Sequence, residues 1–195
     1  MDAPNGRVTY RVDPKPSRFT VQVTAAGLLS SFGHNPVIAV RDFTAEAQFD
    51  PQKPESASLH VVVKAPSLEV MSDVSDKDRR EIESKMHTDV LQSDGFPEIV
   101  FDSSAIKANS ASPGQYWIEI PGKLTLHGVT REQMIRARVT ASAERLRASG
   151  ELSLRQTDYG IELVSAVGGA LKVKDELKCS FDMVATAVKA GEPAA

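Results

Sequence analysis

The sequence predicts an all-β protein, built as an antiparallel barrel of about eight strands with one helix. Apolar and polar residues alternate in several segments, which is typical of strands with one buried face. Turn-forming residues separate these segments, for example at Asn109 to Gly114 and at His127-Gly128. Only one stretch, at about 76–92, has the period of a helix. These patterns indicate roughly eight to ten strands.

The alternating segments follow one another along the chain. Their apolar positions are Phe19, Val21 and Val23; Leu59, Val61 and Val63; Tyr116, Ile118 and Ile120; Ile135, Ala137, Val139 and Ala141; and Leu177, Cys179, Phe181 and Met183. Residues two apart in a strand lie on the same face, so each set defines one apolar face. The turn at His127-Gly128 is expected to join two strands as a hairpin, because Gly128 can adopt positive φ without steric cost.

Small residues on these faces bear on how the strands are arranged. Exposed strand edges promote aggregation, so this many strands must either close into a barrel or stack as a sandwich. Ala45 and Ala47 precede Phe49, and Ala137 lies two residues before Val139. Small inward residues leave room for one small ligand in a barrel of about eight strands. They favour the barrel, although two closely packed sheets would also accept alanine.

The predicted helix spans residues 76 to about 92. Ile82, Met86 and Val90 recur every fourth residue within a charged run, and they form a narrow apolar stripe on a solvated helix. Ser75 stands just before the first turn, where its hydroxyl can accept a hydrogen bond from an unpaired N–H. A glycine and a proline shortly after residue 92 are expected to end the helix.

Composition narrows the classes of function. The chain has 195 residues, 41% hydrophobic and 25% charged, which predicts a single domain over 1–195 with loose tails at 1–6 and 189–195. The net charge is −3 and the basic residues are dispersed, so nucleic acid is not an expected partner. Apolar runs are far shorter than the roughly 20 residues of a membrane-spanning helix, so no span is expected. The first residues lack a secretory signal, which predicts a cytoplasmic protein as the chain stands, or a periplasmic one if a signal was removed.

Neither a metal nor a cofactor is expected. The four histidines are not spaced four residues apart, and Cys179 is the only cysteine. The sequence has no Gly-x-Ser-x-Gly elbow and no glycine-rich phosphate loop. The motifs therefore favour a binding protein over an enzyme, although residues far apart in sequence can converge in a fold.

Several blocks, in the same order, resemble the YceI-like polyisoprenoid-binding proteins. They are Phe32–Asn35, Asp42–Pro51, Gly95–Phe101, Gly122–Arg131 and Arg155–Ile161. The third block is similar to the family's Tyr-Pro-x-Ile-x-Phe pattern, and the fourth to its Gly-x-Leu-Thr-x-x-Gly-Val-Thr hairpin. The resemblance implies a lipocalin-like antiparallel barrel around an apolar tunnel.

The resemblance also implies a ligand and the residues that contact it. The expected function is binding, storage or transport of a long-chain apolar lipid of isoprenoid, quinone-like or fatty-acyl type, with its polar head at the barrel mouth. The candidate ligand-binding residues are His34, Asn35, Phe49, Phe101, Arg155, Cys179 and Phe181. Monomer and homodimer both remain open.

Three alternatives stay open at this point. His34 lies on a corner between a glycine and Asn35-Pro36, where it could either orient a head group or only tie the corner to a backbone carbonyl. Arg155 could instead pin a turn by bonding a carboxylate such as Asp158 or backbone carbonyls. The chain could also be a hydrolase or isomerase acting on a lipid at the mouth, or a barrel with a filled interior.

Overall fold

A computed structural model describes residues 7–26, 35–50, 52–103, 105–166 and 171–188. The predicted tails at 1–6 and 189–195, and the candidate residue His34, lie outside the described residues. The strands are β1 (Val8–Val12), β2 (Arg18–Ala26), β3 (Val37–Val40), β4 (Phe43–Phe49), β5 (Ser58–Lys64), β6 (Leu68–Val70), β7 (Glu98–Ser103), β8 (Lys107–Ser112), β9 (Gln115–Leu126), β10 (Val129–Ala141), β11 (Arg145–Arg155), β12 (Ser165–Ala166) and β13 (Leu171–Ala187). The helical segments are α1 (Asp76–Lys85), the π-helical η3 (Met86–Val90), and the 3₁₀ turns η1 (Pro54–Ser56), η2 (Ala65–Ser67) and η4 (Gln156–Tyr159).

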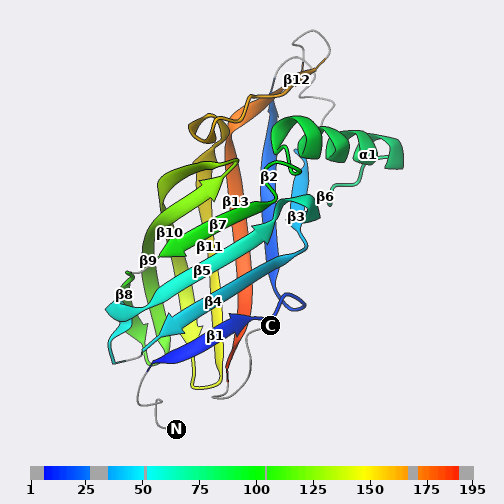
Figure 1. Cartoon of the computed structure of the whole chain (residues 1–195). Coiled ribbons are helices and arrows are strands. Elements are labelled where there is room, and N and C mark those ends of the chain that lie inside the picture. The colour runs from blue at the N-terminus through cyan, green and yellow to red at the C-terminus, as the bar shows by residue number, and fades with distance from the viewer. Residues whose placement is uncertain (1–6, 27–34, 51, 104, 167–170, 189–195) are drawn as a thin grey trace.

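Eight strands close into an antiparallel barrel (Figure 1). Their order is β1-β4-β5-β7-β9-β10-β11-β13, and the last strand pairs back onto the first, with Tyr10 opposite Ala187. Closure leaves no free edge in this ring, which is how small all-β proteins avoid edge-to-edge association. The predicted barrel of about eight strands with one helix is confirmed, and the sandwich alternative is not adopted.

Three further strands, β2, β3 and β6, extend the barrel at one end. Both β1 and β2 pair with β13, β1 at Val12 opposite Ala185 and β2 at Arg18 opposite Asp182. Strands β3 and β6 join β2 in turn, so that β2, β3 and β6 lie together at the upper right of Figure 1. Strand β6 is the last in this order, and it is therefore an edge strand.

The helix begins as the sequence predicts and ends earlier. Ser75 caps it, because its hydroxyl oxygen accepts the backbone N–H of Asp78 at 3.1 Å. The α-helical part ends at Lys85, and the five residues of η3 form a wider turn in which the N–H of Leu91 donates to the carbonyl of Met86 at 2.9 Å. Gln92, with φ of 46°, then turns the chain away, so the helix stops before the predicted residue 92.

Charged side chains of the helix cover the edge of β6. The carboxylate of Glu83 accepts the N–H of Val70 at 2.9 Å, and the guanidinium of Arg79 donates to the carbonyl of Val70. One turn further on, Nε2 of His87 contacts the carbonyl of Leu68 at 3.1 Å. The three side chains stand four residues apart on one helix face, and they satisfy backbone groups that an edge strand otherwise leaves unpaired.

The hairpin between β9 and β10 has the predicted two-residue turn. Both turn residues have positive φ, 51° at His127 and 72° at Gly128. This pair of angles is the one that joins antiparallel strands with the right twist. The ring of Phe96 packs on His127 with centroids 4.4 Å apart, and a Cβ at Gly128 would lie 2.6 Å from the same ring. The turn angles and the packing of Phe96 therefore account for this sequence motif without a functional role.

Candidate functional site

The barrel encloses a cavity of about 280 Å³. Every strand of the closed ring contributes side chains to its lining, and the predicted apolar faces supply a large part of it. Val12 is the residue of β1 that lines the cavity. Of the apolar strand positions predicted above, only Ala141 does not line it. Among the described residues that line it none is charged, and Gln48, Ser58, Gln133 and Gln156 are its polar members apart from one tyrosine.

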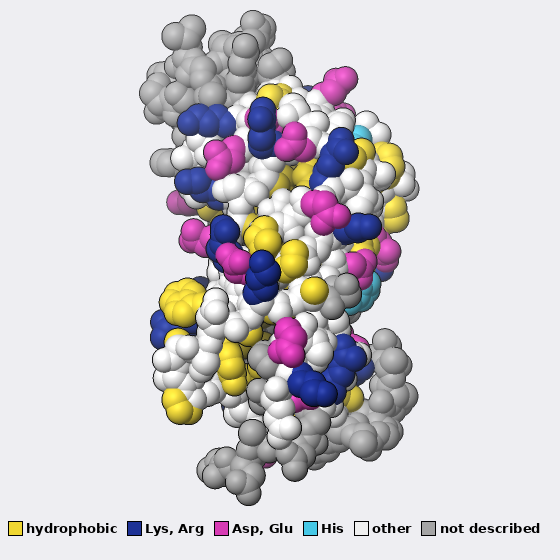
Figure 2. Space-filling view, turned by 90° about the vertical axis from the view of Figure 1, so that its left-hand side faces the viewer, with side chains coloured by type: hydrophobic (Ala, Val, Ile, Leu, Met, Phe, Trp, Pro, Cys, Tyr) yellow, Lys and Arg dark blue, Asp and Glu magenta, His cyan; other side chains and the backbone are white. Residues whose placement is uncertain are grey.

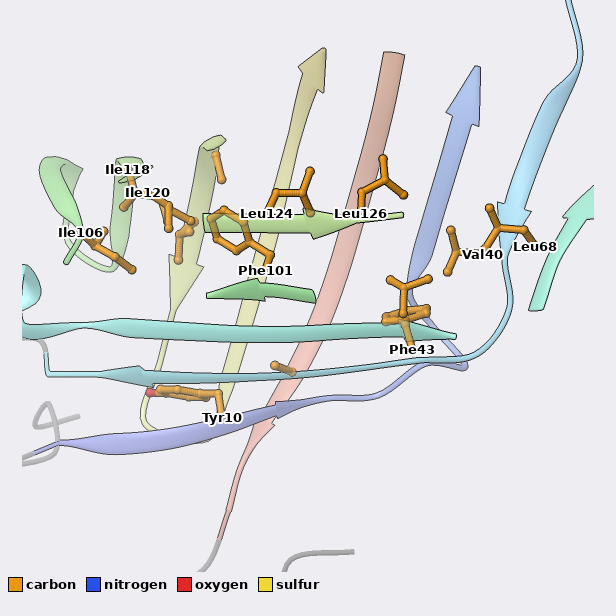
Figure 3. Close-up of a cluster of buried hydrophobic side chains, with 14 of the residues drawn as sticks. Tyr10, Val40, Phe43, Leu68, Phe101, Ile106, Ile118, Ile120, Leu124 and Leu126 are labelled. Atoms are coloured by element: carbon orange, nitrogen blue, oxygen red, sulfur yellow. The ribbon is translucent and has the colours of Figure 1, made fainter. Parts of the chain in front are cut away.

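Four of the predicted site residues lie on this cavity. Phe49 and Phe101 are 6% and 4% exposed, and both border the cavity together with Cys179 and Phe181. The ring of Phe49 meets Tyr116 edge-on, with centroids 5.4 Å apart. Figure 3 shows Phe101 among the buried side chains of the interior, next to leucines of β9. All four residues therefore lie where a residue that contacts a bound lipid chain must lie. Contact with a lipid stays a prediction for each of them.

Two glycines make room for the phenylalanine rings on the cavity wall. Gly122 of β9 lies against Phe101, and a Cβ there would come within 2.8 Å of the ring and 2.5 Å of a backbone oxygen. Gly150 of β11 lies opposite Phe181, and a Cβ there would come within 2.8 Å of that ring. The rings thus occupy the space that a side chain at either glycine would need. Sequence reasoning missed these glycines, because a glycine within a strand does not reveal its cross-strand neighbour.

Cys179 behaves as part of the apolar wall. Its side chain is buried, and burial raises the pKa of its thiol to about 12. The thiol therefore stays protonated at neutral pH, and an inert, small, weakly polar group faces the cavity.

Two tyrosines are almost completely buried, and neither of them lines the cavity. Tyr10 is 1% exposed, and its hydroxyl donates to the carbonyl of Ser142 at 2.7 Å at the lower end. Tyr159 is 2% exposed in η4, and it borders the outer groove described below. Burial raises the pKa of both phenols, so both hydroxyls remain protonated across the ordinary pH range.

The other two described candidates lie away from the cavity. Asn35 is exposed at the start of β3. Arg155 points outward from the end of β11, where its guanidinium donates to Asp175 at 2.9 Å. Its partner is Asp175 rather than the Asp158 that the spacing suggested. A role in binding a head group stays a prediction for both residues.

Arg155 lines a second hollow, an outer groove of about 1060 Å³ between β10, β11, η4 and β13. The groove has three cationic side chains, Lys123, Arg131 and Arg155, and four acidic ones, Glu132, Asp158, Asp175 and Glu176. The Nε of Arg131 donates to the backbone carbonyl of Asp158 at 3.0 Å. Figure 2 shows the same mixing of positive and negative side chains over one whole face of the molecule.

Asp175 holds the turn after β11 in place. Its bonds therefore predict that part of the protein's folding stability is lost at acid pH. Its carboxylate accepts the N–H and the hydroxyl of Thr157 at 2.9 and 2.7 Å, and these bonds, with Arg155, lower its pKa from 3.8 to about 2. Because the folded pKa lies below the unfolded one, this stabilisation is complete above pH 3.8 and is lost as the pH falls toward 2.

Asp175→Asn should therefore lower stability at pH 6 and flatten the loss of stability between pH 4 and pH 2, measured by urea unfolding across this range. Thr157→Val, which removes only the hydroxyl bond, should move the loss to higher pH. An Asp175→Asn protein with the same pH dependence as the parent would contradict this account.

Two features are absent from the described residues. No cluster of three or more histidine, cysteine, aspartate or glutamate side chains there is arranged to hold a metal ion. No helix in the described part of the chain has both the length and the apolar character to span a membrane.

The sequence is similar to a known domain family and to bacterial relatives. Residues 10–185 match the model of the YceI-like domain. A UPF0312 protein of Pseudomonas savastanoi pv. phaseolicola is 30% identical over 159 residues, which cover 78% of this chain and 76% of the relative.

Two solved structures share the fold. One is BcnA of Burkholderia cenocepacia, with a TM-score of 0.68 and 18% identity over 89% of this chain and 98% of that one. The other is a polyisoprenoid-binding domain from Saccharophagus degradans, with a TM-score of 0.66 and 12% identity over 93% and 99%.

Proposed function

The chain belongs to the family of YceI-like domains, and from this premise we propose that it binds a long-chain apolar lipid inside the barrel, for storage or transport. The observation that carries the proposal is the cavity within the closed barrel, whose described lining has no charged side chain. An apolar chain gains free energy in such a site, whereas a buried charge would lack a partner. The polyisoprenoid-binding domain that shares this fold supports the same class of ligand.

The dimensions of the cavity favour a slender ligand. At about 280 Å³ the cavity lies near the lower limit of small-molecule sites, which typically begin at about 300 Å³. An isoprenoid, quinone tail or fatty-acyl chain fits this description better than a fused ring system. Burial of about ten methylene groups would contribute roughly 8 kcal/mol, corresponding to a micromolar Kd before the cost of ordering the chain.

As part of the same proposal, the polar head group stays outside the apolar interior. His34, which precedes β3 by three residues in the sequence, and Arg155, on the outer groove, are the residues proposed to meet it. The cavity wall offers only uncharged amide and hydroxyl groups, so an anionic head would be stabilised outside it and not within.

The protein purified from a bacterial host is expected to carry such a lipid. Native mass spectrometry should show a species heavier than the polypeptide, and organic extraction should release one apolar molecule in near-stoichiometric amount. A native mass equal to that of the polypeptide, with an empty extract, would contradict the proposal. Chemical conversion of an added lipid, in place of its retention, would instead favour the hydrolase or isomerase alternative.

A further inference from the structure

The barrel wall is open between the upper parts of β10 and β11. The two strands pair from Arg136 opposite Glu151 to Ala141 opposite Leu146. No pairing joins the described residues 129–135 of β10 to residues 152–155 of β11. The upper part of β10 pairs only with β9, and the upper part of β11 only with β13. A slit therefore runs between them, next to the outer groove.

This slit differs from the free edge of β6, which lies outside the closed ring. At the edge of β6, three side chains of the helix take up the backbone groups of the strand. At the slit, two side chains of β10 reach across: the Nε of Arg131 donates to the backbone carbonyl of Asp158 at the upper end, and below it lies Gln133. Its Nε2 donates to the carbonyl of Ser153 at 3.4 Å and to that of Met134 at 3.3 Å. Both distances are long for N–H···O hydrogen bonds, so this bridge is weak.

The wall at the slit is one side chain thick. Gln133 and Leu154 line both the outer groove and the inner cavity. Gln133 is half-buried, and its neighbours on the groove side are charged, whereas those on the cavity side are apolar. A change of the Gln133 rotamer would join the two spaces without breaking any strand pairing of the barrel.

We propose that the slit between β10 and β11 is the passage through which a lipid chain reaches the cavity, with Gln133 as its gating residue. The inference rests on the proposed function. It follows from the two residues, Gln133 and Leu154, that line both the outer groove and the cavity, and from the long Gln133 bond across the slit. The chain would pass between Gln133 and Leu154, while the head group remains in the charged outer groove near Arg155.

The test measures the rates at which the full chain binds and releases cis-parinaric acid, a fluorescent fatty acid, by stopped-flow fluorescence. Gln133→Ala removes the bridge, and we expect both rates to rise about fivefold with Kd nearly unchanged, as for a barrier lowered by one weak hydrogen bond. Gln133→Trp should fill the slit and slow both rates. Thr140→Ala and Thr140→Trp are the controls, since Thr140 is exposed on the part of β10 that still pairs with β11 and lines neither the cavity nor the groove, and they should leave the rates unchanged.

Other outcomes would overturn the inference. Rates that respond equally to the Thr140 and Gln133 substitutions would show that the slit is not the passage. A changed Kd with an unchanged association rate would make Gln133 a contact within the cavity. If Gln133→Trp fails to fold, the faster exchange expected of Gln133→Ala still decides the matter. A parent protein that binds no probe and purifies without lipid would refute the proposed function itself, whereas binding with insensitive rates would refute only the passage.

Discussion

Replacing Cys179 with phenylalanine is expected to weaken lipid binding about 50-fold while the barrel remains folded. Cys179 is small and buried in the cavity wall, midway along β13, so a benzyl side chain there would project into the space proposed for the lipid chain. Displacing about three methylene groups at roughly 0.8 kcal/mol each costs about 2.4 kcal/mol, which corresponds to this loss of affinity. Lipid content after purification and the Kd for cis-parinaric acid would measure the effect.

Ser180→Phe is the matched control for this substitution. Ser180 is the next residue of β13 and is exposed on the outer face. The same side chain placed there should leave both the bound lipid and the Kd unchanged. Equal loss of lipid from both variants would show that the interior face of β13 does not border the ligand. A Cys179→Phe protein that loses about 1–3 kcal/mol of stability, with its lipid intact, would indicate a packed core at this position.

Gly150→Ala is expected to destabilise the protein by about 3 kcal/mol, at the upper end of the usual range for overpacking. A Cβ at this position would contact the backbone carbonyl of Arg136 on the neighbouring strand and would lie 2.8 Å from the ring of Phe181. The ring can rotate away, but the carbonyl belongs to a paired strand and cannot. In a chain of this size, thermal unfolding should shift down by roughly 6–12 °C.

Gly95→Ala provides the comparison. A Cβ at Gly95 would meet its nearest atom, the carbonyl oxygen of Gln92, at 3.5 Å, an ordinary contact. We therefore expect a change of stability within about 0.5 kcal/mol, as for most surface substitutions. If Gly150→Ala were as stable as Gly95→Ala, the close packing of Phe181 over β11 would be wrong.

Much of this protein could be predicted from local patterns in the sequence. The period of two placed Phe19, Val61, Ile118 and Phe181 on inward faces, because alternation of side chains along a strand is a property of the backbone itself. The turn at Gly128 and the cap at Ser75 were predicted for the same reason, since both depend on interactions within a few residues. The small alanines correctly favoured a barrel with an interior space.

Only the tertiary structure decided which strands become neighbours, and hence the features that depend on them. Arg155 meets Asp175 twenty residues later in the chain and not the nearby Asp158, because β11 and β13 pair in the fold. The ring of Phe181 covers Gly150 for the same reason, and the slit at Gln133 exists because two paired strands diverge partway along their length. Alternation specifies the face on which a side chain lies, whereas register and neighbour are set by long-range pairing around the whole barrel.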